Sequence, residues 1–580
     1  MRNLTPVEFP MSPSFAPLDW IVLVAYFAAT MGIGFFFYRK TRTTDGFTAG
    51  NRSIPGWVCG LSIFATFLSS ISYLANAGKT FVSDWNAFVF SLSVPLGTWV
   101  AVRWFLPYYR KSQHVSAYAA LEDRFGLWAR LYASFFYMLT QLARMAVVMY
   151  LVALPMQVIF GWDIMAILLV IGISVTIYSF VGGVLAVIWT DAIQAIVLMA
   201  GAVIALVVIL VQMPGGAGQI IEVASAHDKF SLGSFSLEMA EKTFWTLILF
   251  GIAENLRNFG IDQSYIQRYI ASRSDREAKR GLWLAGWLYV PMSAVFFFIG
   301  TALFAFYNAD QVIEIETTSL VWESTALEDL HQVRRVVAKQ ELLQMGVDVD
   351  SHEFSANQMS LASDKGLEEL GDRVFPYFIA TQLPPGITGL LIAAVFAAGM
   401  STISTSLNSS ATLFMTDYYR RLIDPNASER KQMGALYMAT FIWGAAGTGL
   451  ALLLVQVTQS ALDMWWTLSG IFSGGMVGLF LLGLISHRAR NPQAVCAVIL
   501  GVLVILWMSL PKIAEMFLRA NESSLVYGIG STLQNLSSGG FASPFNALLI
   551  PVFGTLTILL SGILFTNWFG SRNDSATDKG

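Results

Sequence analysis

Runs of apolar residues recur along most of the chain and are separated by shorter polar segments. A run of about 20 such residues crosses the hydrocarbon core of a bilayer as an α-helix. The runs lie near residues 18–38, 55–77, 86–108, 130–160, 163–181, 185–212, 243–263, 281–306, 376–414, 433–457, 464–486, 493–511 and 543–567. This pattern predicts an all-α polytopic membrane protein with about 13 transmembrane helices.

Lys and Arg gather in every second loop between these spans. The basic clusters lie at residues 39–52, 110–130, 268–280, 420–431 and 487–490. By the positive-inside rule such loops are cytoplasmic, so the remaining loops face outward. We therefore expect a multi-pass protein of the plasma (inner) membrane, with its N-terminus outside and its C-terminus in the cytoplasm.

One span, residues 391–414, is crowded with hydroxyl groups. Ser401, Ser404 and Thr405 are spaced by three and four residues, which brings them to one face of a helix. Together with a carbonyl such as that of Ala398, these neutral oxygens suit a hard monovalent cation, and sodium is the obvious candidate. The alternative is that these small residues only pack helices together.

Four charged residues lie inside apolar spans, where charge is costly and usually functional. Glu254 and Arg257 are three apart on one helix, so a structural ion pair is the favoured interpretation. Asp191 has no oppositely charged neighbour in its span, and a bound cation would be a suitable partner. Arg144 also lacks a local carboxylate, so its planar guanidinium could bind an anionic substrate or pair with another helix.

The span at residues 55–77 combines the hydroxyls of Thr66, Ser69, Ser70 and Ser72 with small residues in its second half. This composition is typical of an unwound transporter helix, whose free carbonyls bind an ion at mid-membrane. We therefore expect a break in this helix.

Composition limits the function classes further. The chain has 580 residues, of which 55% are hydrophobic and 13% charged, and its net charge is -3. Five His and two dispersed cysteines, Cys59 and Cys496, offer neither a nucleophile with its base nor a metal cluster, so we expect no enzyme activity and no cofactor. The tail after Asn567 is too short for a sensor domain, and no nucleic-acid partner is expected. A channel stays open as an alternative, although a broken-helix ion site favours occlusion.

Several strings, taken in this order, resemble the sodium:solute symporter family. They include GWVCGLSIFATFLSS, AYAALEDRFG, GGVLAVIWTDAIQ, DQSYIQRYIASRSDREAKRG and LIAAVFAAGMSTISTSLNSSATLF. The resemblance implies a LeuT-type core of five-plus-five inverted repeats, preceded by one extra helix and followed by two. The first helix of each repeat is broken in that fold, which puts the breaks near residues 55–77 and 243–263.

The resemblance also implies a division of the chain. The expected segments are an outer N-terminus with the extra first helix at residues 1–54, the first repeat and the start of the second at 55–307, an outer helical insertion at 308–372, the rest of the second repeat at 373–486, two C-terminal helices with a long outer loop at 487–567, and a cytoplasmic tail at 568–580.

The same resemblance implies where sodium binds. The common sodium site of the family falls on the carbonyls of Ala65, Leu68 and Ala398 and on the hydroxyls of Ser401 and Thr402. Some members hold a second sodium, and the matching residues are Asp191, Ser401, Ser404 and Thr405. Two sodium ions per cycle are compatible with these residues, which do not fix the stoichiometry.

Within the family, the sequence looks closest to the bacterial sialic acid symporters, which bind the substrate carboxylate with an arginine and with hydroxyls. The matching residues are Arg144, Ser69 and Ser72. At three further substrate positions Phe67, Ala87 and Ser91 replace a threonine, an aromatic residue and a glutamine. We keep Ser91 among the substrate-binding residues, but loss of the glutamine weakens the case for sialic acid itself, and a different carboxylate or sugar acid would tolerate the changes.

Sugar-transporting members offer an alternative. They bind the sugar with an asparagine in the second broken helix, where this chain has Asn255, although Asn258 replaces their gating tyrosine. The sequence therefore predicts a sodium-coupled secondary active symporter for a small organic solute, either a carboxylate such as sialic acid or, as the alternative, a neutral sugar or polyol. Its partners are that solute and the lipid bilayer; the oligomeric state stays open, with a monomer as the expectation.

Overall fold

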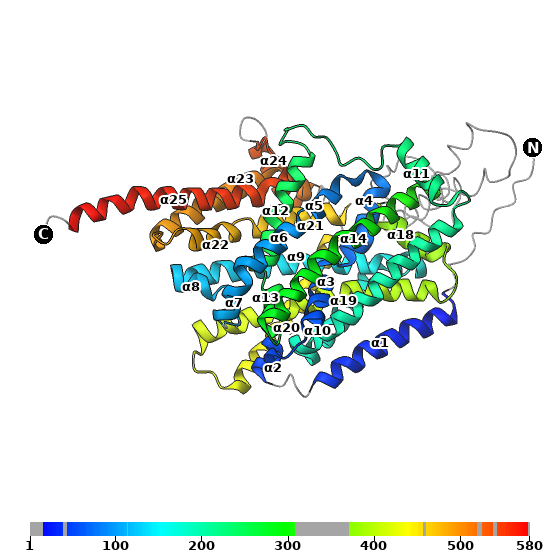
Figure 1. The fold of residues 1–580 in the computed structure, drawn as a ribbon, viewed down its shortest axis with the longest axis horizontal. Helices are drawn as coiled ribbons and strands as arrows, with labels where there is room; N and C mark the ends of the chain where they lie inside the picture. The colour runs from blue at the N-terminus through cyan, green and yellow to red at the C-terminus, as the bar shows by residue number, and fades with distance from the viewer. Residues whose placement is uncertain are drawn as a thin grey trace, which may run out of the picture.

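The computed structural model is a bundle of helices (Figure 1). It describes residues 15–38, 43–112, 114–307, 371–455, 460–518, 525–537 and 542–577. Within these ranges the β-structure is a single bridge between Ile54 and Ser272, so the all-α class is confirmed. The predicted outer insertion at 308–372 lies outside the described residues except for Gly371 and Asp372.

The helices of the first half are α1 (Pro17–Tyr38), α2 (Thr44–Ala49), α3 (Gly56–Phe67), α4 (Asn76–Val82), α5 (Val89–Leu92), α6 (Val94–Val100), α7 (Leu106–Ser112), α8 (Ala119–Phe125), α9 (Leu127–Phe160), α10 (Ile164–Gln212) and α11 (Gly216–Ala226). Those of the second half are α12 (Phe244–Ile261), α13 (Gln263–Ala271), α14 (Asp275–Tyr307), α18 (Gly371–Thr381), α19 (Ile387–Leu413), α20 (Glu429–Leu454), α21 (Ala461–Ser473), α22 (Met476–Ile485), α23 (Asn491–Leu518), α24 (Leu525–Ser537) and α25 (Ile550–Thr577). Wider π-helical turns occur at η3 (Ile71–Ala75), η5 (Ala101–Phe105) and η7 (Phe414–Ile423).

Among the described residues, 8 helices are long and apolar enough to cross a membrane, or 10 if each bent pair counts as one span. Shorter apolar helices at Pro17–Ile33 and Ile164–Ile177 coincide with two further predicted spans. Every predicted span falls at least partly on a helix, while the total of about 13 and the repeat symmetry stay predictions.

The predicted span at 376–414 has a different boundary. It is divided between α18 and α19, because Pro384 and Pro385 cannot donate the backbone hydrogen bonds of a continuous helix. Gly386 follows with φ +89°, and a Cβ there would lie 2.9 Å from Leu18. The membrane helix therefore begins at Ile387, and the preceding segment forms a separate short helix.

The expected break in the span at 55–77 is confirmed. The helix runs as α3 to Phe67 and resumes at Ile71, with a bend of 58° between the two halves. The span near 243–263 also breaks at its end, where Asp262 adopts an extended conformation between α12 and α13. A third break was not predicted: α21 and α22 meet at an angle of 45° beside Gly474 and Gly475.

Small residues bring α3 close to its neighbour. A Cβ on Gly60 would lie 2.6 Å from the Gly281 carbonyl of α14, and a Cβ on Gly281 would lie 2.4 Å from the Gly56 carbonyl. The two backbones touch where larger residues would force them apart. The N-terminal half of α3 is thereby held against α14.

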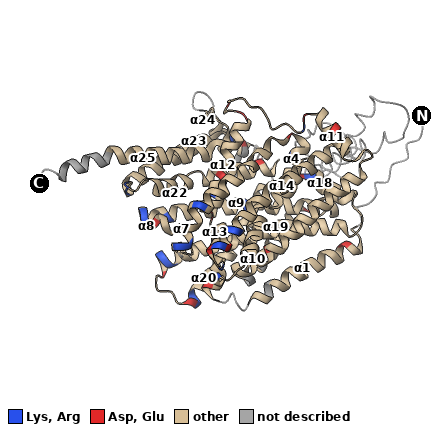
Figure 2. Ribbon diagram, in the orientation of Figure 1, with Lys and Arg blue, Asp and Glu red and all other residues tan. Residues whose placement is uncertain are grey.

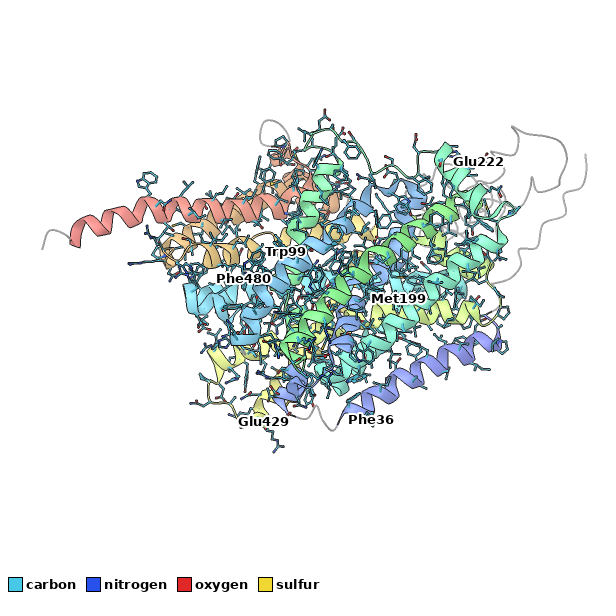
Figure 3. The ribbon with its side chains drawn as sticks, in the orientation of Figure 1. Phe36, Trp99, Met199, Glu222, Glu429 and Phe480 are labelled. Carbon is cyan, nitrogen blue, oxygen red and sulfur yellow. The ribbon has the colours of Figure 1, made fainter. Side chains whose placement is uncertain are left out.

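Charge is distributed unequally over the bundle. Figure 2 shows Lys and Arg gathered at one end, around α7, α8, α13 and α20. Side chains fill the space between the helices (Figure 3), while Phe36 and Trp99 point outward, with 73% and 49% of their surface exposed. Exposed apolar side chains over the middle of the bundle are what a lipid-facing surface requires.

The expected outer loop between the two C-terminal helices contains structure of its own. α23 extends to Leu518, and α24 covers Leu525–Ser537 inside the stretch that was expected to be a loop. This stretch is rich in Ser, Gly and Asn, which are typical of loops, and it nevertheless forms a helix. Within that helix the Ser531 and Thr532 hydroxyls donate to the Gly528 carbonyl.

Candidate functional site

The predicted common sodium site combines the end of α3 with the middle of α19, two helices that pack together. α3 ends at Phe67, so the Ala65 carbonyl belongs to its last turn, and Leu68 lies in the break itself. On α19 the Thr402 hydroxyl donates to the Ala398 carbonyl at 3.1 Å. The elements therefore supply the backbone and hydroxyl oxygens that a sodium ion uses.

Ser401 and Asp191 meet between α19 and α10. Both residues are 0% exposed, and the Ser401 hydroxyl lies beside the Asp191 carboxylate. Neither Ser401 Oγ nor Asp191 Oδ1 makes a hydrogen bond of regular geometry. Buried oxygens are seldom left unpaired, so this pair fits a bound cation.

Arg268 of α13 occupies part of the predicted second sodium site. Its Nη2 donates to Asp191 Oδ2 and to Thr405 Oγ1, both at 2.7 Å, and its Nε donates to Ser62 Oγ at 2.7 Å. Ser62 in turn donates to Asp191 Oδ2. Within its own span Asp191 has no oppositely charged neighbour, as predicted; its partner, which the sequence did not predict, is the fully buried Arg268 of another helix.

Ser404 points elsewhere. Its hydroxyl donates to the Ser401 carbonyl at 3.2 Å, a local bond within α19. Of the four residues predicted for a second sodium, Asp191 and Ser401 lie side by side, whereas Thr405 is bound to Arg268.

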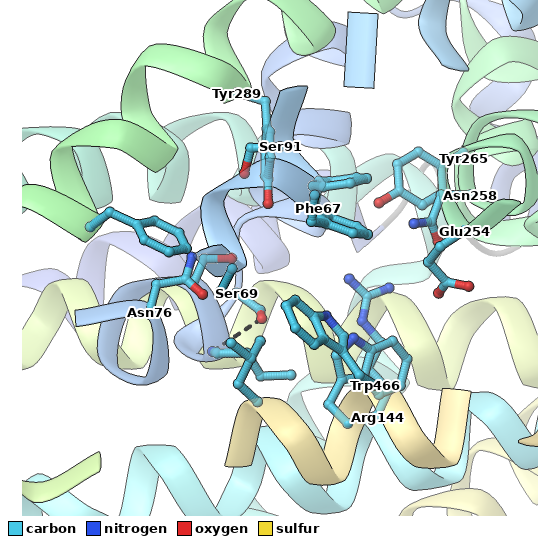
Figure 4. A pocket seen from close by; sticks show the side chains of 17 residues that line it. Phe67, Ser69, Asn76, Ser91, Arg144, Glu254, Asn258, Tyr265, Tyr289 and Trp466 are labelled. Atoms are coloured by element: carbon cyan, nitrogen blue, oxygen red, sulfur yellow. Dashed lines mark hydrogen bonds between the residues drawn. The ribbon is translucent and has the colours of Figure 1, made fainter. Parts of the chain in front are cut away.

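A cavity of about 50 Å³ lies beside the break in α3 (Figure 4). It has room for a few water molecules. It is lined by Phe67, Ser69, Ile71, Ser72, Asn76, Ala87, Phe90, Ser91, Arg144, Glu254, Asn258, Tyr265, Tyr289, Phe297, Leu462, Trp465 and Trp466. The structure thus brings together four of the five predicted substrate residues, Ser69, Ser72, Ser91 and Arg144.

Arg144 of α9 projects into this cavity from below in Figure 4. Its Nη2 donates to the Thr66 carbonyl, and its guanidinium lies 5.7 Å from the centre of the Trp465 ring. The Tyr265 hydroxyl lies beside it. Because Thr66 belongs to the last turn of α3, the guanidinium stabilises the negative end of that helix while its other donors remain available to an anion.

The predicted hydroxyls have distinct local roles. Ser69 Oγ accepts from the Ile71 amide at 3.2 Å and so caps the restarting helix. Ser91 Oγ lies 2.7 Å from Ser293 Oγ, and the Tyr289 hydroxyl faces both Ser72 and Ser91. These hydroxyls make part of the cavity wall polar.

Phe67 stands in the middle of the cavity lining. Its ring stacks on Phe259 at a centroid distance of 5.4 Å and meets Tyr289 edge-on at 4.3 Å. A threonine at this position would leave the volume of a phenyl ring empty. The small size of the cavity therefore has an identifiable cause in this side chain.

Asn255 does not line the cavity. Its Nδ2 donates to Ser93 Oγ at 2.8 Å, and a Cβ on Gly97 would lie 2.9 Å from Asn255 Cβ. The side chain thus faces the α5 and α6 segment. The sugar-binding role suggested by its position in the sequence has no support from this geometry.

Glu254 and Arg257 form the expected ion pair, with Nη2 and Oε1 2.5 Å apart and a second contact at 3.1 Å. Ser469 also donates to Glu254, and Arg257 reaches Asp262 at 3.3 Å. The sequence identifies Glu254 as a charged residue inside a membrane span, but it does not predict that Glu254 lines the cavity.

Sequence reasoning also missed several uncharged lining residues. Asn76, Tyr265, Tyr289 and Trp465 all line the cavity. No charge or hydroxyl cluster distinguishes them from ordinary packing residues, so only the helix arrangement could have identified them.

Comparison with known proteins shows the family of the chain. The model of the sodium:solute symporter family matches residues 47–323 and 362–501. A sodium/sialic acid symporter NanT from Aliivibrio fischeri is 30% identical over 92% of this chain and 94% of its own length. A sodium/sialic acid symporter SiaT from Proteus mirabilis is 30% identical over 85% and 89%.

A solved structure shows the same fold. It is a substrate-bound, outward-open Na⁺-coupled sialic acid symporter, 27% identical, which aligns over 96% of this chain and 98% of its own with a TM-score of 0.75. The family match and the shared fold lead to one conclusion. The chain belongs to the sodium:solute symporter family.

Proposed function

We propose that this protein is a sodium-coupled secondary active symporter that imports a small organic carboxylate. The observation that carries the proposal is the break in α3. Ala65 and Leu68, expected to bind sodium, border this break, and Ser69, Ser72 and Arg144 line the cavity beside it. One unwound segment thus supplies groups to both sites, so occupation of one site can change the other.

Sodium coupling follows from this shared segment. Sodium bound by Ala65, Leu68, Ala398, Ser401 and Thr402 would hold the end of α3 against α19. The substrate cavity would then be formed before the substrate arrives. By linkage, sodium and substrate must raise each other's equilibrium affinity by the same factor. The inward sodium gradient and the membrane potential supply the work. The potential contributes about 2.3 kcal/mol for each charge and each 100 mV.

A second sodium ion is proposed at Asp191, Ser401, Ser404 and Thr405. The neighbouring oxygens Asp191 Oδ1 and Ser401 Oγ, which make no hydrogen bond of regular geometry, support it. Arg268 limits it, because it already binds Asp191 Oδ2 and Thr405. The ion would therefore lie on the Oδ1 side of the carboxylate and share it with the arginine.

The substrate is proposed to be sialic acid or a related sugar acid. Arg144 provides the fork of donors that a carboxylate prefers. The relatives that share 30% identity are named as sialic acid symporters. Phe67 leaves little room for a nine-carbon sugar acid, so binding requires that the ring rotate or that the substrate be smaller. The alternative, a neutral sugar bound by Asn255, lacks support from the cavity lining.

The remaining architecture is proposed from the family and from the charge distribution. The end of the bundle rich in Lys and Arg would face the cytoplasm, with the N-terminus outside. The core would be the LeuT-type five-plus-five repeat. No resident cofactor or catalytic role is proposed, and the chain is expected to work as a monomer in the plasma membrane.

A binding measurement tests the class of substrate. Calorimetric titration of the purified protein with sialic acid, smaller sugar acids, monocarboxylates and glucose is made in sodium chloride and in choline chloride. The proposal expects a carboxylate to bind in sodium, and more weakly in choline. Binding of glucose alone, or equal binding in both salts, would contradict it.

A further inference from the structure

The N-terminal end of α14 carries a second cavity, away from the transport site; in the proposed orientation, on which this inference rests, that end faces the cytoplasm. The cavity is shallow and wide open, with a volume of about 580 Å³. It is lined by Val102, Arg276, Lys279, Arg280, Trp283, Leu284 and Trp287. Three cations and a largely apolar wall thus share one hollow.

The lining residues form a stripe along α14. Arg276, Arg280 and Leu284 are spaced by four residues, as are Lys279, Trp283 and Trp287, so the two rows run side by side on one helix face. Trp287 is 64% exposed, and its ring stacks on Trp283 at a centroid distance of 6.2 Å. The opposite face of the helix, with Gly281 and Leu282, is buried in the protein.

The stripe changes from charged to apolar with depth. Each helical residue adds about 1.5 Å, so Trp287 lies about 10 Å beyond Arg280 along α14. This helix is long and apolar enough to span a membrane. The cations therefore lie at the height of phosphate groups and the tryptophans at the start of the acyl chains.

None of the three cations forms an ion pair with an acidic residue in the described part of the chain. The carboxylates of the same turn are bound mainly elsewhere: Asp275 accepts from Arg110 at 2.7 Å, and Glu277 accepts from the Gly56 amide at 2.7 Å. Glu277 also pairs with Arg273 at 3.4 Å and attracts Arg280 only at longer range. Among the described residues, the positive charge of this turn is therefore not neutralised by ion pairs.

We propose that this cavity binds an anionic phospholipid of the inner leaflet, with the lipid phosphate among Arg276, Lys279 and Arg280. One acyl chain lies along Trp283, Leu284 and Trp287. Charge complementarity selects the anionic headgroup, and each cation near the surface adds to the attraction. A soluble anion would leave the exposed tryptophans uncovered, so a lipid fits the cavity better than free phosphate.

The test uses the full-length protein in phosphatidylcholine nanodiscs into which increasing amounts of brominated phosphatidylglycerol are mixed. Bromine quenches tryptophan fluorescence at short range. The wild type should be quenched at lower lipid fractions by brominated phosphatidylglycerol than by brominated phosphatidylcholine. Arg276→Gln/Lys279→Gln/Arg280→Gln should reduce this preference at least about tenfold. Trp283→Phe/Trp287→Phe should remove the part of the quenching that shows this preference, whereas the other exposed tryptophans, such as Trp57 and Trp99, should be quenched equally by both lipids.

The matched control is Arg430→Gln/Arg488→Gln/Arg490→Gln. It removes the same charge from exposed positions in other basic loops. The proposal requires that this variant keep the wild-type preference, with both triple variants eluting as the wild type does on size exclusion. Equal loss in both variants would mean a general surface attraction and would overturn the site. No preference in the wild type would overturn it as well.

Discussion

Arg268 Nη2 lies 2.7 Å from Asp191 Oδ2, and the two side chains are 1% and 0% exposed. The pair joins α13 to α10 inside the membrane part of the bundle. A buried ion pair of this kind is expensive to break from one side, because the remaining charge stays in a low-dielectric site. The pair therefore links the fold to the proposed second sodium site.

Arg268→Gln should leave the Asp191 carboxylate buried without its arginine. We expect a loss of about 3–5 kcal/mol of stability in sodium-free buffer. Sodium should restore part of it, because the ion can then neutralise the carboxylate. Thermal unfolding in choline and in sodium chloride measures both effects. An exposed control, Arg488→Gln, should change neither, and equal melting of both variants in choline would contradict this assignment.

Asp191→Asn should affect the number of ions that drive transport. If Asp191 binds a second sodium, the Hill coefficient for sodium should fall from about two to about one. Uptake measured over a range of sodium concentrations gives this coefficient. A coefficient near one in the wild type would instead limit the cycle to the common site.

Ser401→Ala should weaken sodium binding without unfolding the protein. The hydroxyl lies beside the Asp191 carboxylate but makes no hydrogen bond of regular geometry, so the loss of a sodium ligand should outweigh the loss of a contact within the protein. We expect the half-saturating sodium concentration to rise about tenfold. Thr440→Val removes a hydroxyl that bonds only to the Leu436 carbonyl, and it serves as the control. A similar rise in the control would show that hydroxyl loss acts through packing.

The arginine of the cavity can be tested separately. Arg144→Lys keeps the positive charge and removes the planar fork, so a carboxylate should lose a charge-assisted hydrogen bond. The KM should rise about 10- to 100-fold, with a smaller change in the sodium dependence. Unchanged KM for a carboxylate would place its binding group elsewhere.

Phe67→Thr should enlarge the cavity, because the ring stands among its lining residues. Affinity for sialic acid should increase relative to that for smaller carboxylates. Phe67→Leu retains most of the apolar volume and should change this ratio less. Competition of both ligands against one labelled substrate measures the ratio; a ratio unaffected by threonine would show that Phe67 does not limit substrate size.

One carboxylate outside the predicted membrane helices should respond to pH. Burial raises the pKa of Asp372 from 3.8 to about 6, although it accepts a hydrogen bond from the Ala461 amide at 2.7 Å. Because the folded protein holds this proton more tightly, stability should fall as pH rises from about 4 to about 6, by at most about 3 kcal/mol. Asp372→Asn should flatten that part of the pH profile of thermal unfolding. An unchanged profile would assign the dependence to other groups.

Features whose signal extends over many residues, such as membrane spans and basic loops, could be predicted from the sequence. Apolar runs located the spans and basic clusters marked one end of the bundle, because each signal is summed over many positions. The hydroxyls around Ser69 and Ser72 indicated the break in the helix for the same reason.

Contacts between distant residues were not predictable in this way. Arg268 is 77 positions from Asp191, and the residues around each of them give no indication that the two form an ion pair. Asn255 has a suitable side chain, but the rotation of α12 directs it toward Ser93. The boundary of α19 depended on two prolines inside an apolar run, where hydropathy alone shows no interruption.

The most direct test of the account is uptake of radiolabelled sialic acid into proteoliposomes, with and without an inward sodium gradient. We expect accumulation only with the gradient and its loss in Arg144→Ala, while glucose is not accumulated. Uptake that is indifferent to sodium, or glucose uptake that survives Arg144→Ala, would contradict the central claim.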